Sequence, residues 1–413
     1  MEELWPAPSA RVSELIRAIA EQKLPLSEDF LDRLWAASQA GTREREFVDD
    51  PVLAEADRRL NKSNMTHWLV SNLHHPGRRV PPSGDREMYI YARDLVLRGM
   101  DIDDLGSWRA AQRVGWQWWI DACFAATTDH DELRELVEVS GNSMTTFVDD
   151  SIAAVAAYAD DVRSELGRDA HTPQRFATAQ LLLEGAPISR VRAEEQLGYA
   201  LTGHHVAAIV WADSEEDAPH LEAAAEHVMR ACGTTRRLTL VVSTAAQWLW
   251  MPARVVPPVA RIQNILMKTP GIRVAFGRPA SDVEGFRTSH LDAVAAQRLL
   301  ARLRSPHVVV RYEDVQLVDL LTADLAKAEQ FVATTLGELA TADPLIQRTV
   351  RMYVSEGFNI SSTADRMFAH RNTVDRRLAR ARAMLPRPLD QDPTGVDAAL
   401  MLVELRQDQQ RSD

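Results

Sequence analysis

Apolar residues recur at helical spacing through the first 166 residues of the chain. They stand three or four positions apart in six segments, at residues 11–24, 26–40, 51–73, 85–98, 105–126 and 132–165. Repeats of this kind predict amphipathic helices, and no alternating strand pattern is convincing here. We therefore predict an all-α bundle over residues 9–166. Residues 133–166 could form one long helix, although Gly141 weakens it.

From residue 171 onward the pattern indicates a mixture of helices and strands. Two short helices, broken at Gly185-Ala186-Pro187, come first. Short apolar runs then predict strands at 206–211, 238–242, 248–251, 272–276 and 308–311, with helices at 219–231, 259–267 and 289–303. The order β-α-β-β-α-β-α-β predicts a ferredoxin-like α/β domain over residues 171–312, as in nucleotide cyclase cores.

The last hundred residues are again helical in pattern. We predict a connecting helix at 317–339 within residues 313–342, a helix at 344–356, and a final helix at 396–405. Leu345, Val350 and Val354 would be the buried side chains of the middle one of these. Residues 343–406 should thus form an all-α domain. Together with the bundle and the α/β domain, it makes the chain an α+β multidomain protein.

Residues 359–385 predict two short helices joined by a tight turn at 369–371. Ser361 and Ser362 would cap the first helix, and Ser362 with Asp365 fits a capping box. The apolar positions of that helix are Ala364, Met367 and Phe368.

The second short helix has one narrow apolar stripe and one polar face. The stripe consists of Val374, Leu378, Ala381 and Leu385. At about 100° per residue, Asn372, Arg376 and Arg380 fall opposite it. Thr373 lies beside them, and Arg377 and Arg382 lie on the flanks.

This second helix carries a strong positive charge in an acidic protein. The stretch from Arg366 to Arg387, both ends included, contains seven arginines and one acid, Asp375, whereas the whole chain has a net charge of −12. A local basic face indicates an anionic partner. In a helix-turn-helix the second helix enters the major groove of DNA, where Arg and Asn pair with base edges. The same pattern also fits a solvated helical hairpin, because arginine is a good helix former.

The stretch HRNTVDRRL, preceded by STADRMF, resembles the C-terminal helix-turn-helix of PucR (CdaR-like) bacterial transcription regulators. The residues that match the family signature are Thr363, Ala364, His370, Asn372, Thr373, Val374, Arg377 and Leu378. Arg376 stands where the family usually has an aromatic residue. We therefore expect double-stranded DNA as the partner. The DNA-binding residues we expect are Arg371, Asn372, Thr373, Arg376, Arg377 and Arg380.

Two further resemblances lie in the N-terminal and middle parts of the chain. The stretch from Gly271 to Leu300 resembles the GGDEF-like middle domain of PucR regulators, and residues 9–166 loosely resemble the N-terminal domain of RsbRD-type stress regulators. A diguanylate cyclase needs carboxylates for two metal ions and a glycine turn at the central hairpin. The hairpin at 242–248 has neither, so it offers no acid that could share a metal ion with Asp213. We expect no enzyme activity, no catalytic or metal-binding residues and no cofactor.

Composition and the family resemblance set the remaining expectations. No apolar run approaches the ~20 residues of a membrane span, and the acidic N-terminus is not a signal peptide, so we expect a cytoplasmic protein with reduced cysteines. The negative net charge predicts a local DNA contact by a homodimer or higher homo-oligomer. The resemblance implies a transcriptional regulator, often an activator, that responds to a metabolite. The tryptophan-rich bundle could line an effector pocket or simply fill a core. The alternative is a stress-signalling scaffold that acts through protein partners.

Overall fold

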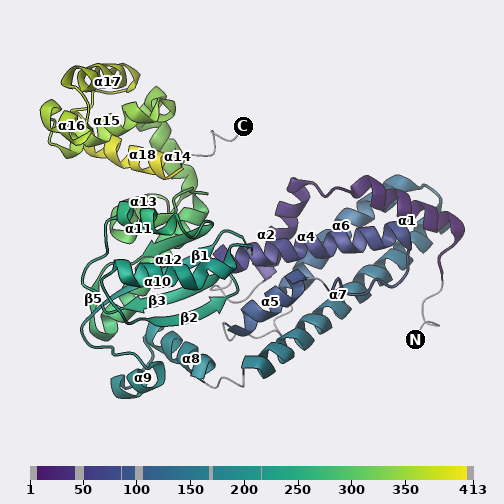
Figure 1. Ribbon diagram of the computed structural model, residues 1–413. Helices are drawn as coiled ribbons and strands as arrows, with labels where there is room; N and C mark the ends of the chain where they lie inside the picture. The colour runs from purple at the N-terminus through teal and green to yellow at the C-terminus, as the bar shows by residue number, and fades with distance from the viewer. Residues whose placement is uncertain are drawn as a thin grey trace. The chain divides into compact units, whose positions relative to one another are not determined.

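The computed structural model describes residues 7–41, 51–84, 86–97, 106–166, 171–214 and 216–406. Within these ranges the N-terminal region is helical, as its apolar spacing predicts (Figure 1). The helices are α1 (Ala10–Lys23), α2 (Glu28–Gly41), α4 (Pro51–His74), α5 (Arg86–Leu97), α6 (Gly106–Ala126) and α7 (His130–Leu166). The outermost residues of two expected helices, Asp85, Arg98 and Leu105, lie outside the described part. The long helix predicted around Gly141 is confirmed as α7.

Tryptophan side chains fill the core of the helical bundle. Trp68 and Trp119 are buried and meet edge to face, with ring centroids 4.7 Å apart. Trp118 stacks on Phe30 at 3.9 Å. Trp116 differs, because it also lines a cleft of about 560 Å³ between α6 and α7. The bundle therefore uses tryptophans to fill its core, and one of them also borders a cleft.

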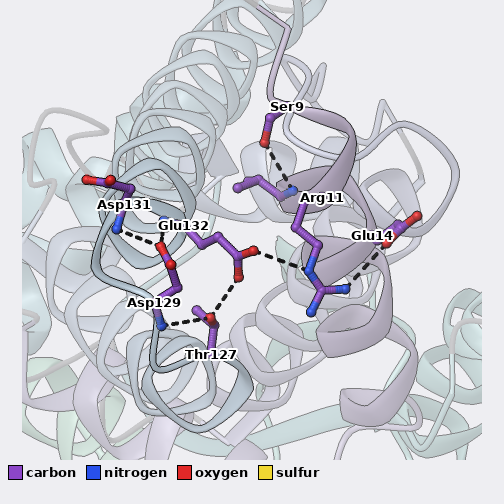
Figure 2. A network of polar contacts seen from close by, with 8 residues as sticks. Ser9, Arg11, Glu14, Thr127, Asp129, Asp131 and Glu132 are labelled. Carbon is purple, nitrogen blue, oxygen red and sulfur yellow. Dashed lines mark hydrogen bonds and ion pairs between the residues drawn. The ribbon is translucent and has the colours of Figure 1, made fainter.

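The turn between α6 and α7 is tied to the beginning of α1 by polar contacts (Figure 2). Arg11 on α1 pairs with Glu132 at 3.4 Å, and Glu132 accepts a hydrogen bond of 2.8 Å from Thr127 Oγ1. Asp129 Oδ1 accepts the backbone N–H groups of Asp131 and Glu132, at 2.9 and 3.0 Å, and so caps α7. The Asp129 cap fixes the residue at which α7 begins. The partly exposed Arg11–Glu132 ion pair adds little to the stability.

Both cysteines are free thiols. Cys123 lies in the bundle core, and burial raises the pKa of its thiol to about 12. Burial likewise raises the pKa of Cys232 to about 12. Both side chains therefore remain protonated near neutral pH, as expected for unreactive structural cysteines.

The middle of the chain forms an α/β domain in the predicted order. After α8 (His171–Leu183) and α9 (Arg190–Leu197) come β1 (His204–Ala212), α10 (Leu221–Ala231), β2 (Leu238–Ser243), β3 (Ala246–Met251), α11 (Val259–Leu266), β4 (Ile272–Phe276), α12 (Asp282–Arg302) and β6 (Val309–Arg311). The described strands form one sheet, whose main path has the order β2-β3-β1-β4-β6. With β1 between β3 and β4, this is the ferredoxin-like arrangement with one added parallel strand, β6.

Two features of the α/β domain differ from the sequence prediction. Ala280–Ser281 form a short strand, β5, that pairs antiparallel with β1 at His204 and His205. Helix α12 begins at Asp282, whereas the apolar pattern placed its start at residue 289. The first two turns of α12, DVEGFRT, have only Val283 and Phe286 as apolar side chains and include Gly285, so the helical spacing was not recognised there.

Gly277, directly after β4, allows α12 to pack tightly against the strands. Its N–H donates to Ala207 O at 3.0 Å, and the Ala207 N–H donates to Ser289 Oγ at 2.8 Å. A Cβ atom at position 277 would lie 1.7 Å from the carbonyl oxygen of Ser289. No side chain fits there without moving α12 away from the sheet.

The prediction of a single connecting helix at 317–339 is wrong. The structure has two helices, α13 (Tyr312–Leu321) and α14 (Leu325–Leu336), followed by a 3₁₀ turn at Gly337–Thr341. Thr322 Oγ1 donates to Val318 O at 2.7 Å where α13 ends, and Asp324 Oδ1 accepts the Lys327 N–H at 3.1 Å as the cap of α14. Leu336 and Leu339 are fully buried in the C-terminal core, so α14 is part of that core.

Four more helices complete the C-terminal core: α15 (Pro344–Ser355), α16 (Ile360–Arg366), α17 (Arg371–Met384) and α18 (Pro393–Arg406). Val350 is buried as predicted, but Leu345 is exposed and Ile346 occupies the core instead. Among the residues described, none of the helices combines the length and apolar character that crossing a membrane requires.

Candidate nucleic-acid interface

Helices α16 and α17 form the predicted helical pair, but α16 is capped by a residue that the sequence prediction missed. Asn359 Oδ1 accepts the N–H groups of Ser361 and Ser362, at 3.0 and 3.1 Å. The predicted caps, Ser361 and Ser362, therefore lie inside the first turn. Asparagine ranks with serine as an N-cap, and its position one residue before Ile360 was the available signal.

The turn lies earlier in the chain than predicted. Met367 ends α16, and α17 already begins at Arg371. His370 is the N-cap of α17, because its Nδ1 accepts the Asn372 N–H at 3.2 Å. Phe368, between the helices, has a left-handed backbone with φ of 50°. It was expected to be an apolar position of α16, but its side chain is exposed.

The apolar stripe of α17 is buried as predicted. Val374, Leu378 and Ala381 pack into the C-terminal core with Ile346 and Val350. Leu385, the fourth residue of the stripe, is half-buried at the C-cap. Burial of this stripe sets the rotation of α17 and leaves its opposite face in solvent.

The predicted DNA-binding residues lie on that face or beside it. Arg371, Asn372, Arg376 and Arg380 are exposed, whereas Thr373 and Arg377 are half-buried. No hydrogen bond or ion pair joins the four arginine side chains, Arg371, Arg376, Arg377 and Arg380, to another residue in the described part of the chain.

Arginines elsewhere in the same core behave differently. Arg351 pairs with Asp397 and Glu404, and Arg366 pairs with Glu356 at 2.9 Å. These two arginines are thus neutralised by nearby carboxylates, whereas the four arginines of α17 are left available. Such guanidinium groups suit the paired acceptors of guanine or the oxygens of phosphate, and Asn372 suits adenine.

At the second candidate site, the hairpin between β2 and β3, two backbone amides of the turn already have side-chain acceptors. Asp94 of α5 is buried, and its Oδ1 accepts the Thr244 N–H at 2.6 Å. The neighbouring Ala245 N–H donates to Ser243 Oγ at 3.1 Å. The Asp94 carboxylate therefore already accepts the hydrogen bond of a backbone amide that a nucleotide phosphate would need. Within the described ranges, no group of three or more His, Cys, Asp or Glu is placed to hold a metal ion.

Comparison with protein families gives two matches. Residues 346–403 match the PucR C-terminal helix-turn-helix domain, and residues 184–299 match a GGDEF-like domain. No curated protein matches the chain. Among solved structures, a regulator of polyketide synthase expression from Bifidobacterium adolescentis is similar at 17% identity and a TM-score of 0.29, over 57% of this chain and 93% of that one. The resemblance of the N-terminal bundle to RsbRD-type regulators stays a prediction.

Proposed function

We propose that this chain, which carries a PucR-type helix-turn-helix domain and a GGDEF-like domain, is a sequence-specific transcriptional regulator that inserts α17 into the major groove of DNA. One observation carries the proposal. The four arginines Arg371, Arg376, Arg377 and Arg380 have no partner among the described residues, on a helix whose other face is fixed in the core. An unpaired basic face on a protein of net charge −12 is best explained by an anionic ligand.

The regulator is proposed to act as a homodimer or higher homo-oligomer. One small helical domain buries too little DNA surface for high specificity, and the acidic rest of the chain repels the phosphates. Two copies bind half-sites about 10 base pairs, or a multiple of that, apart. Pairing therefore raises affinity without a larger DNA contact on each chain.

We propose a division of the chain that follows the sequence prediction with one change. Residues 9–166 form the sensing or assembly domain and residues 171–312 the GGDEF-like domain. The DNA-binding domain starts at α14, before residue 343, because Leu336 and Leu339 belong to its core. The segment 313–342 is therefore not a free connector.

The signal is proposed to enter through the N-terminal bundle in the cytoplasm. The cleft between α6 and α7 would hold a small-molecule effector, since it places Trp116 beside Arg113, Glu138 and Asn142. A cleft that combines an indole ring, a positive charge, a negative charge and an amide suits a small polar metabolite. Activation of catabolic or nitrogen-use genes is the output that the family resemblance implies.

A salt titration of DNA binding by the full-length protein tests the proposal. DNA fragments are first obtained by genome-wide mapping of bound sites. We expect log Kd for a mapped site to change steeply with log salt, by about 0.9 per phosphate contacted. Light scattering should give a mass above the 46.2 kDa of one chain. A protein that binds no DNA at low salt would instead be a scaffold, and a monomer that binds DNA normally would refute the oligomer.

The GGDEF-like domain is proposed to have no cyclase activity. Incubation with GTP and Mg²⁺ or Mn²⁺ should yield no more cyclic dinucleotide than a boiled control. The reason is that the hairpin amide of Thr244 is held by Asp94 and that the hairpin has no acid to share a metal with Asp213. Product above the control that disappears in Asp213→Ala would contradict this.

A further inference from the structure

Phe368 violates two local preferences at once. Its φ of 50° places it in the left-handed region, which residues with a Cβ avoid. Its side chain is 98% exposed, so the ring gains nothing from burial in the fold. Strained, solvent-facing apolar residues persist when the strain serves a function, which makes Phe368 a candidate for contact with a ligand.

The strained position is the one that glycine usually fills in such turns. The Phe368 N–H donates to Asp365 O at 3.2 Å, and the Ala369 N–H donates to Ala364 O at 2.9 Å, which closes the end of α16. Glycine is the common residue at this left-handed position after a helix, and helix-turn-helix turns often contain it. Phenylalanine here therefore costs stability that glycine would not.

Phe358 shows what such a residue does when its role is structural. It also has a left-handed backbone, with φ of 65°. Its ring meets Tyr353 edge to face at 5.4 Å and is 42% exposed. The aromatic contact with Tyr353 thus offsets the free-energy cost of the backbone strain at Phe358. Phe368 has no ring contact of that kind within the described residues.

We propose that Phe368 is the apolar contact of the DNA interface, with its ring against the duplex beside the bases that α17 reads. This rests on the function proposed above. Phe368 lies two residues before the His370 cap, and Arg371 and Asn372 follow on the first, exposed turn of α17. Unpaired cations next to the ring favour DNA over a second protein surface. The apolar groups of DNA within reach are thymine methyls and deoxyribose.

Phe368→Gly tests the proposal, with Phe358→Gly as the matched control. The first variant removes strain and an exposed ring, so we expect its melting temperature to equal or exceed that of the wild type. Its Kd for a mapped site should rise at least about fivefold, with the salt slope unchanged because no phosphate contact is lost. The control should lose thermal stability through its tyrosine contact, but bind DNA like the wild type below its melting temperature.

The outcomes separate the proposal from its alternatives. Phe368→Gly with wild-type affinity overturns it, and so does a loss of affinity that comes with dissociation of the oligomer, since the ring would then serve a protein interface. Uracil in place of thymine identifies the group covered. If it weakens the wild type but not Phe368→Gly, the ring covers a methyl, and if neither changes, it covers sugar. Wild-type protein that binds no DNA refutes the proposed function itself.

Discussion

Arg376→Ala is expected to weaken binding to a specific site by about 1–3 kcal/mol, which is roughly 5- to 150-fold in Kd. Arg376 is exposed, has no partner among the described residues, and lies opposite the buried Val374–Leu378–Ala381 stripe. This is the position from which a side chain reaches base edges when α17 lies in the groove. Competition binding against single-base variants of the site should show relaxed preference at one position.

Arg382→Ala is the matched control for Arg376. Arg382 is also an exposed arginine of α17, but it lies on the flank of the helix near its C-terminal end. Its loss should weaken binding about equally on all sequences and lower the salt slope by roughly 1. Equal losses on specific and random DNA for Arg376→Ala would show that Arg376 contacts phosphate, and the base-reading role would then be wrong.

Gly277→Ala is expected to destabilise the GGDEF-like domain by about 3 kcal/mol or more. The added Cβ would overlap the carbonyl oxygen of Ser289, at 1.7 Å, and neither backbone can move without breaking the hydrogen bonds through Ala207. Hydrogen exchange of the β1 and β4 amides measures this locally, because global unfolding of a multidomain chain is not two-state.

Gly233→Ala isolates the steric part of that effect. Gly233 has a left-handed φ of 72° but open space around it, so alanine there adds backbone strain of only about 1–2 kcal/mol. Exchange protection in β4 should therefore fall far more in Gly277→Ala. If the two variants behave alike, α12 does not pack against the sheet as closely as the structure shows.

Features that depend on residues close in sequence were predicted from the sequence. The helices of the bundle and the five predicted strands lie where apolar spacing placed them, within a few residues, since the period of burial is encoded locally. The stripe Val374–Leu378–Ala381 also follows from spacing, because a helix with one apolar side has only one way to bury it. The exposed face of Arg376 and Arg380 is the geometric consequence of that burial.

The sequence by itself determined the three-part α+β architecture and which side of α17 faces solvent, because both follow from local periodicity and charge. Only the tertiary structure decided the pairing of β5 with β1 and the contact of Asp94 with the hairpin. It also placed Phe368 outside the core. Each of these depends on a partner distant in the chain or on a backbone angle, and neither leaves a periodic trace in the sequence.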